Sequence, residues 1–173
     1  PGDPRDEIAD DWNDHYLGEN IAQEPSLPFE PLSTSLGHSS LSVLDPTFSS
    51  EFAVDVVTSE REERRTLDIE ETDRPPVDYS EDIVVAVHSG YGSSSKQHQF
   101  QRIEMTEDGI HLHGYYTHPL IMTLDYTARH SVHRVKQPTA TEISTVTVSL
   151  TITESKRVHF DSTADVFGFS ESE

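Results

Sequence analysis

The chain is predicted to be an all-β protein, an antiparallel β-sandwich or small barrel of about seven or eight strands with one N-terminal helix. Three observations predict this fold. Apolar and polar residues alternate over short stretches after residue 51, residues 83–87 form a continuous β-branched run typical of a buried central strand, and turn-forming residues separate the stretches. Residues 145–152 alternate most clearly, because serine or threonine follows each apolar residue there.

At 173 residues the chain is expected to hold one domain with extended ends. We expect an acidic N-terminal helix and extended arm over residues 1–50, the β-sandwich over residues 51–161, and an acidic tail over residues 162–173.

The N-terminal helix is predicted over residues 3–18. Asp3 suits its N-cap, Pro4 suits its first turn and Gly18 suits its end. Its apolar stripe, at four-residue spacing, consists of Ile8, Trp12 and Tyr16. Trp12 is expected either to anchor the helix on the sheet or to contact a partner, because the opposite helix face is acidic.

Residues 19–50 are rich in proline, serine and leucine, which predicts an extended connection over the surface. Short strands are then expected over residues 52–56 and 67–69, on either side of a charged turn at residues 60–65. An acidic loop is expected over residues 70–82.

Residues 97–105 are predicted to form a strand with a bulge, because the apolar phase shifts between Phe100 and Ile103. The sequence Glu107-Asp108-Gly109 is typical of a hairpin turn and leads into a strand over residues 110–116.

A further strand is predicted over residues 122–132. Its apolar face is expected to consist of Met122, Leu124, Tyr126, Ala128 and Val132. Strands over residues 145–152 and 158–160 complete the series.

Acidic residues outnumber basic residues by 32 to 12. Residues 1–82 hold 22 carboxylates and five arginines, a formal charge of −17, whereas residues 83–160 hold six acids, seven bases and eight of the ten histidines. Such a charge repels nucleic acid and anionic lipid, and it is tolerated best where salt screens it. We therefore expect a halophilic protein of haloarchaeal type that has no nucleic-acid partner.

The absence of cysteine excludes disulfides, thiolate metal sites and a cysteine nucleophile. No stretch approaches the roughly 20 apolar residues of a membrane-spanning helix. Because the sequence begins at Pro1 without methionine, we expect a chain that is either processed or trimmed, and a removed export signal or lipid-anchor segment upstream is compatible with this start. The expected location is extracytoplasmic, either secreted or anchored at the cell surface.

The histidines offer a candidate metal site. His111 and His113 are two residues apart on a predicted strand and therefore share one face. His133 is expected on the polar face of another strand, which makes it the preferred third ligand for Zn²⁺ or Cu²⁺. The alternative is a solvent-facing strand that carries polar residues and binds no cofactor.

No sequence context indicates catalysis. The G-x-S-x-G motif of a serine nucleophile is absent, and the loop Gly90-Tyr91-Gly92 precedes a predicted strand rather than the helix that would bind a phosphate. We therefore expect binding rather than an enzymatic reaction.

The uneven charge favours binding to a protein partner or to a second copy of the chain. An acidic region is expected to contact a basic face made by Arg102, His111, His113, Arg129, His133 and Arg134. The leading hypothesis is a non-catalytic, extracytoplasmic protein-interaction module. The alternatives are a histidine-based metal-binding protein or metalloenzyme, and a structural component of a cell surface or virion.

Residues 83–138 combine a buried strand, the turn Gly90-Tyr91-Gly92-Ser93, a strand with Ile103, a turn at Gly109 and a closing segment at residues 133–138. This arrangement resembles the C-terminal domain of the PrcB-type protease-complex stability factor family. The resemblance implies a small extracytoplasmic β domain that acts in protein interaction. The family's Thr-Gly-Gly-Tyr-like turn is replaced here, and the resemblance assigns no site residue.

The melting temperature is expected to rise as NaCl is added, because added ions screen the repulsion between carboxylates. Circular-dichroism melting curves over a NaCl series measure this effect. A melting temperature that falls with added NaCl would refute the prediction.

Overall fold

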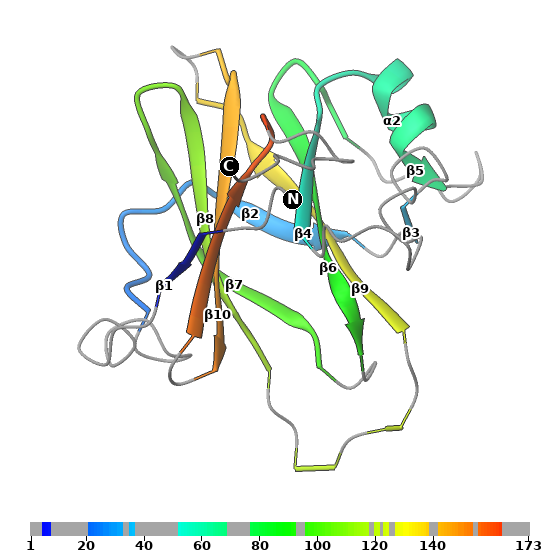
Figure 1. The fold of residues 1–173 in the computed structure, drawn as a ribbon. Coiled ribbons are helices and arrows are strands. Elements are labelled where there is room, and N and C mark those ends of the chain that lie inside the picture. Colours follow the sequence, from blue (N-terminus) through cyan, green and yellow to red (C-terminus); the bar gives the residue numbers. More distant parts are fainter. Residues whose placement is uncertain are drawn as a thin grey trace, which may run out of the picture.

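The computed structural model describes residues 5–7, 21–32, 35–36, 52–68, 77–92, 96–117, 120–121, 123–124, 127–138, 142–153 and 156–163. Over these residues the chain is mostly β, with one short helix (Figure 1). The strands form two larger sheets that share an apolar core, so the predicted all-β sandwich is confirmed.

The first sheet has the strand order β1-β11-β10-β8-β7. Its strands are β1 (Arg5–Glu7), β7 (His98–Met105), β8 (Gly109–Tyr116), β10 (Thr145–Thr153) and β11 (Lys156–Asp161).

The second sheet has the strand order β2-β9-β6-β4, and all of its pairs are antiparallel. Its strands are β2 (Phe29–Leu32), β4 (Phe52–Val57), β6 (Asp82–Gly92) and β9 (Thr127–Lys136). A separate two-stranded sheet pairs β3 (Ser35–Leu36) with β5 (Leu67–Asp68), and α2 (Glu60–Thr66) lies between β4 and β5 in the chain.

One strand pair departs from the predicted antiparallel arrangement, because β8 and β10 are parallel. The strand between them in the chain, β9, belongs to the second sheet. The chain therefore crosses between the sheets twice after β8, and these two crossings allow β10 to run in the same direction as β8. Local alternation does not reveal such a crossover, so the sequence did not predict it.

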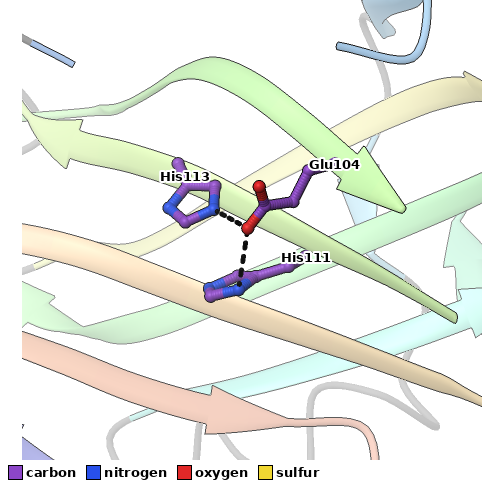
Figure 2. A group of neighbouring side chains, drawn as sticks. All are labelled: Glu104, His111 and His113. Carbon is purple, nitrogen blue, oxygen red and sulfur yellow. Dashed lines mark hydrogen bonds and ion pairs between the residues drawn. The ribbon is translucent and has the colours of Figure 1, made fainter. Parts of the chain in front are cut away.

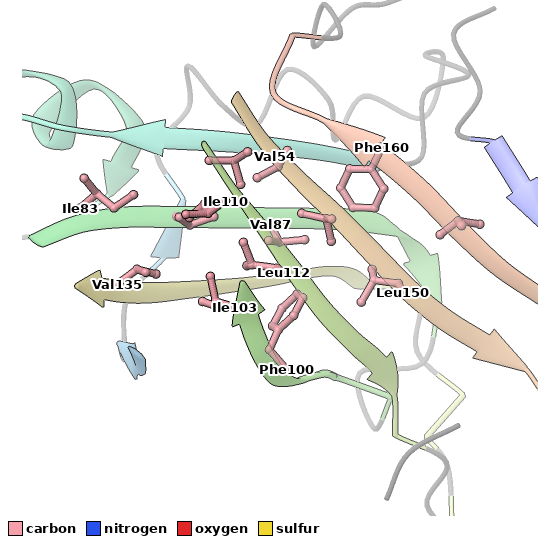
Figure 3. Close-up of a cluster of buried hydrophobic side chains, with 14 of the residues drawn as sticks. Val54, Ile83, Val87, Phe100, Ile103, Ile110, Leu112, Val135, Leu150 and Phe160 are labelled. Atoms are coloured by element: carbon pink, nitrogen blue, oxygen red, sulfur yellow. The ribbon is translucent and has the colours of Figure 1, made fainter. Parts of the chain in front are cut away.

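The main core lies between the two sheets (Figure 3). On β6, Ile83, Val85 and Val87 belong to this core. The first sheet contributes, among others, Phe100, Ile103, Ile110, Leu112, Val148, Leu150 and Val158. The expected central strand is thus confirmed.

A second apolar cluster lies on the other face of the second sheet and explains why β6 is apolar on both sides. Val84 and Ala86 of β6 belong to it, together with Val132 of β9. Val57 of β4 and Leu67 of β5 complete its buried part, so the segment that contains α2 covers this face of the sheet.

The prediction of a charged turn at residues 60–65 is wrong, because these residues form α2. The Ser59 hydroxyl accepts a hydrogen bond from the backbone N–H of Glu62 at 3.2 Å. The carboxylate of Glu62 in turn accepts from the backbone N–H of Thr58 at 2.7 Å. Serine three residues before glutamate is a helix-start signal, and here it outweighs the polar composition of the segment.

The predicted helix over residues 3–18 is wrong at residues 5–7, because these residues form β1 and pair with β11. The rest of the expected helix, including Trp12, lies outside the described residues. The expected arm also contributes β2, which pairs with β9 at the edge of the second sheet. Residues 164–173 of the expected acidic tail lie outside the described residues as well.

The predicted β7–β8 hairpin and its bulge are confirmed. The backbone N–H of Thr106 donates to the carbonyl of Gly109 at 2.9 Å, which closes the turn. The pairing shifts register between Phe100 and Arg102, within the stretch where the apolar phase changes.

Glycine is needed at position 109 because there is no room for a side chain, not because of the backbone torsion angles. A Cβ atom at this position would overlap the backbone carbonyl oxygen of Thr145, the residue that pairs with Gly109 where β8 and β10 begin. The close approach of these two strands therefore depends on a residue without a side chain.

Gly109→Ala is expected to lower the free energy of unfolding by about 1–3 kcal/mol, because one strand must move to relieve the overlap. Urea unfolding measures the change, and Glu107→Ala in the exposed turn is the matched control. Equal stability of Gly109→Ala and the wild type would contradict the observed pairing of β8 with β10.

Candidate functional site

The β7–β8 hairpin brings together Glu104, His111 and His113, as Figure 2 shows. Glu104 pairs with His111 across the two strands, and Arg102 pairs with His113. Side chains alternate along each strand, and Ile103 and Leu112 belong to the main core. Their neighbours therefore lie on the outer face of the first sheet.

The three side chains are close enough to bind one ion. The Oε1 atom of Glu104 is 2.8 Å from Nε2 of His113 and 3.6 Å from Nδ1 of His111. The two imidazole rings are stacked, with centroids 4.0 Å apart and planes 28° apart. One ligand atom from each residue lies within 4.8 Å of the other two.

Hydrogen bonds to neighbouring strands hold both imidazoles. An Arg157 N–H donates to Nδ1 of His113 at 3.0 Å, and Arg157 is fully buried. Because Nδ1 accepts, the ring proton of His113 is on Nε2 and is donated to Glu104. The Ser149 hydroxyl bridges Nε2 of His111 and Nδ1 of His159, with both distances 2.6 Å.

The protonation states suit metal binding at neutral pH. Burial, followed by the charge of His113, lowers the pKa of His111 from 6.5 to about 3. Burial also lowers the pKa of His113. Burial alone would raise the pKa of Glu104, but the hydrogen bond from His113 and the charges of His113 and Arg102 lower it overall. Two neutral imidazoles therefore face one carboxylate, and these are the charge states that bind metal ions once Nε2 of His113 has given up its ring proton.

The sequence predicted two of these three residues but not Glu104. The hairpin turn at residues 107–109 could have identified it, because counting back from the turn places residue 104 opposite His111. The same register places Arg102 opposite His113, and the bulge then brings Phe100, rather than Gln101, opposite Gly114.

His133, the third ligand predicted from the sequence, does not join this group. It lies on β9 in the second sheet, and its ring contacts the rings of Phe29 and Phe100, with centroids 6.0 and 5.1 Å away. The prediction placed His133 on a polar outer face, whereas it shares the inner side with Val135 of the main core. Both faces of the second sheet carry apolar clusters, so the alternation of residues along β9 does not show which face is turned towards the first sheet.

The expected single basic face is not formed. Arg102 lies beside Glu104 at 3.4 Å on the first sheet, and its side chain is mostly buried. Arg134 lies on the second sheet and pairs with Glu30. Arg129 belongs to β9 and pairs with Ser89 along the backbone, but its side chain, like Trp12, lies outside what the structure describes.

The connection from β8 to β9 carries large apolar side chains in solvent. Leu120, Ile121 and Leu124 are 105%, 86% and 103% exposed. The prediction that Leu124 faces the core of a strand over residues 122–132 is therefore wrong. The strand begins only at Thr127.

A second polar cluster lies where β6, β7 and β9 approach each other. Nε2 of His98 is 2.6 Å from the Ser89 hydroxyl, and Nδ1 of His98 is 3.0 Å from the Ser131 hydroxyl. Tyr116 donates its hydroxyl hydrogen to Ser89. Ser89 is fully buried and cannot meet a substrate as a nucleophile, so these groups satisfy one another inside the fold.

No family model matches the chain. Searches of curated proteins and of solved structures also find no significant match. The described helix is too short and too polar to cross a membrane.

Protonation of His133 is expected to destabilise the fold in acid. Burial lowers its pKa from 6.5 to about 4, so the unfolded chain binds a proton more readily than the folded chain over this range. The stability contributed by neutral His133 is present above about pH 6.5 and is lost as the pH falls towards 4, by up to about 3 kcal/mol.

Urea unfolding of the wild type and His133→Gln between pH 7.5 and 4 measures this contribution, because glutamine cannot be protonated. The other buried histidines act equally in both proteins, so the difference between the two pH profiles isolates His133. The wild type should lose more stability than the variant, and parallel profiles would contradict the assignment.

Proposed function

We propose that the chain is a non-catalytic protein-interaction module that binds its partner through the apolar residues of the β8–β9 connection. The observation that carries this proposal is the exposure of Leu120, Ile121 and Leu124, at 105%, 86% and 103%. We call these three residues the apolar loop. In Figure 1 the coloured parts of the connection lie beyond the ends of β7 and β9.

The apolar loop is unusual for a chain of this composition. Only 33% of the residues are hydrophobic and the net charge is −20, yet three large aliphatic side chains lie within five positions and in water. Burial of such a side chain contributes about 1.5–3 kcal/mol, and none of this is gained within the described fold. Exposed apolar groups gathered in one place mark interaction sites, and loops on a rigid β-sandwich are common carriers of binding residues.

The charge of the chain favours a protein as the occupant. A net charge of −20 repels nucleic acid and anionic lipid surfaces. A second copy is a poorer match, because two clefts among the described residues, of about 230 and 310 Å³, have charged or hydroxyl groups in their lining and suit an aliphatic side chain badly. A different protein with an apolar groove therefore fits the apolar loop best.

The same charge supports a halophilic source, in which high salt screens the carboxylates, and we propose a location outside the cytoplasm. The resemblance of residues 83–138 to the PrcB-type domain supports the same compartment and the same class of function. Both statements are part of the proposal.

Replacing the apolar loop residues, in the triple variant Leu120→Ser, Ile121→Ser and Leu124→Ser, is expected to weaken partner binding at least about 100-fold. Loss of three buried aliphatic groups removes 3 kcal/mol or more from the binding free energy. The melting temperature should stay unchanged, because these side chains are already in solvent.

The partner is identified with a photo-crosslinking amino acid at position 121, with the same group at exposed Glu142 as the control. The purified partner is then titrated with the wild type, the triple variant and Met105→Ser, which removes an exposed apolar side chain elsewhere. Equal affinity of wild type and triple variant would refute the proposal. Binding to lipid vesicles that is lost in the triple variant would replace the protein partner with a membrane.

A further inference from the structure

Glu104, His111 and His113 carry an inference that does not depend on the apolar loop. We propose that these residues bind one transition-metal ion of the Cu²⁺ or Zn²⁺ type on the outer face of the first sheet, between β7 and β8. The ligands are Oε1 of Glu104, Nδ1 of His111 and Nε2 of His113.

The geometry needs only side-chain adjustment. Ligand atoms about 2.0–2.1 Å from one tetrahedral ion lie about 3.3 Å from each other. The Glu104–His113 distance is now 2.8 Å, the Glu104–His111 distance is 3.6 Å, and one ligand atom of each residue lies within 4.8 Å of those of the other two. The paired strands β7 and β8 fix the three Cα positions, so the ion can bind without a backbone rearrangement.

The ligand types select the class of metal. Imidazole nitrogen suits Zn²⁺ and Cu²⁺, whereas Mg²⁺ and Ca²⁺ prefer ligand sets made of oxygen. Two imidazoles and one carboxylate leave at least one coordination position for water or for an exogenous ligand.

His111 is held from behind in the way that metal-binding histidines usually are. Its Nε2 contacts the fully buried Ser149 hydroxyl, which also contacts His159. This contact fixes the ring while Nδ1 faces Glu104.

Two guanidinium groups limit the affinity and affect the choice of metal. Arg102 lies 3.4 Å from Glu104, and Arg157 donates to Nδ1 of His113. An ion on Nε2 of His113 needs the lone pair of that nitrogen, so the ring proton that Nε2 now donates to Glu104 must move to Nδ1, and the hydrogen bond from Arg157 to Nδ1 is then lost. Only a metal with strong bonds to nitrogen offsets this cost, so we expect affinity to fall from Cu²⁺ to Zn²⁺ and to be negligible for Mg²⁺.

Isothermal titration of the full chain with Cu²⁺, Zn²⁺ and Mg²⁺ tests the proposal. We expect one Cu²⁺ per chain, with an electron paramagnetic resonance spectrum that shows coupling to two imidazole nitrogens. His111→Gln and Glu104→Gln should each weaken binding about tenfold or more. His130→Gln removes an exposed histidine from the second sheet and should leave the affinity unchanged.

Absence of binding at micromolar Cu²⁺ and Zn²⁺ overturns the proposal. So does a His111→Gln affinity equal to that of the wild type, or an equal loss in His130→Gln, because either result assigns the ion to scattered surface groups. His113 is more deeply buried, so circular dichroism first establishes that His113→Gln is folded. If His113→Gln unfolds, the metal affinity of His111→Gln and the resonance spectrum of the wild type test the proposal without it. The apolar loop variant should keep full metal affinity, which separates this proposal from the proposed function.

Discussion

The packing of Ile103, Ile110 and Leu112 between the sheets determines where the polar side chains of the β7–β8 hairpin lie. All three are fully buried in the main core. Because alternate residues of a strand point to opposite faces, their burial directs Glu104, His111 and His113 outward. A shift of the strand register by one residue would move the carboxylate and both imidazoles into the apolar interior, at a cost of several kcal/mol. The candidate metal site is thus a consequence of how the core is filled.

The parallel pairing of β8 with β10 supplies the groups behind that site. It sets Ser149 beside His113, and β11 then pairs Ser149 with His159 and Thr151 with Arg157. A fully buried guanidinium is costly unless it is hydrogen-bonded, and His113 satisfies part of this need. The polar outer face of the first sheet is therefore a connected network rather than a set of separate surface residues.

Local sequence patterns correctly predict the features that depend on a single strand or a single turn. The central strand, the β7–β8 hairpin, its bulge and the shared face of His111 and His113 all follow from alternation and turn chemistry. The same patterns failed for α2, where capping by Ser59 and Glu62 outweighs the charged composition, and for Leu124, whose apolar side chain lies in solvent. Alternation shows which residues share a face, but it does not show whether that face is covered.

The sequence by itself determined the fold class, the phase of the central strand and the pairing of two histidines, because each depends on neighbours within a few residues. Only the tertiary structure decided that β10 runs parallel to β8, that His133 faces the main core and that Glu104 completes the metal-ligand group. These outcomes depend on which sheet each strand joins. The sheet that a strand joins is determined by packing between residues far apart in the chain, and local periodicity does not predict this packing.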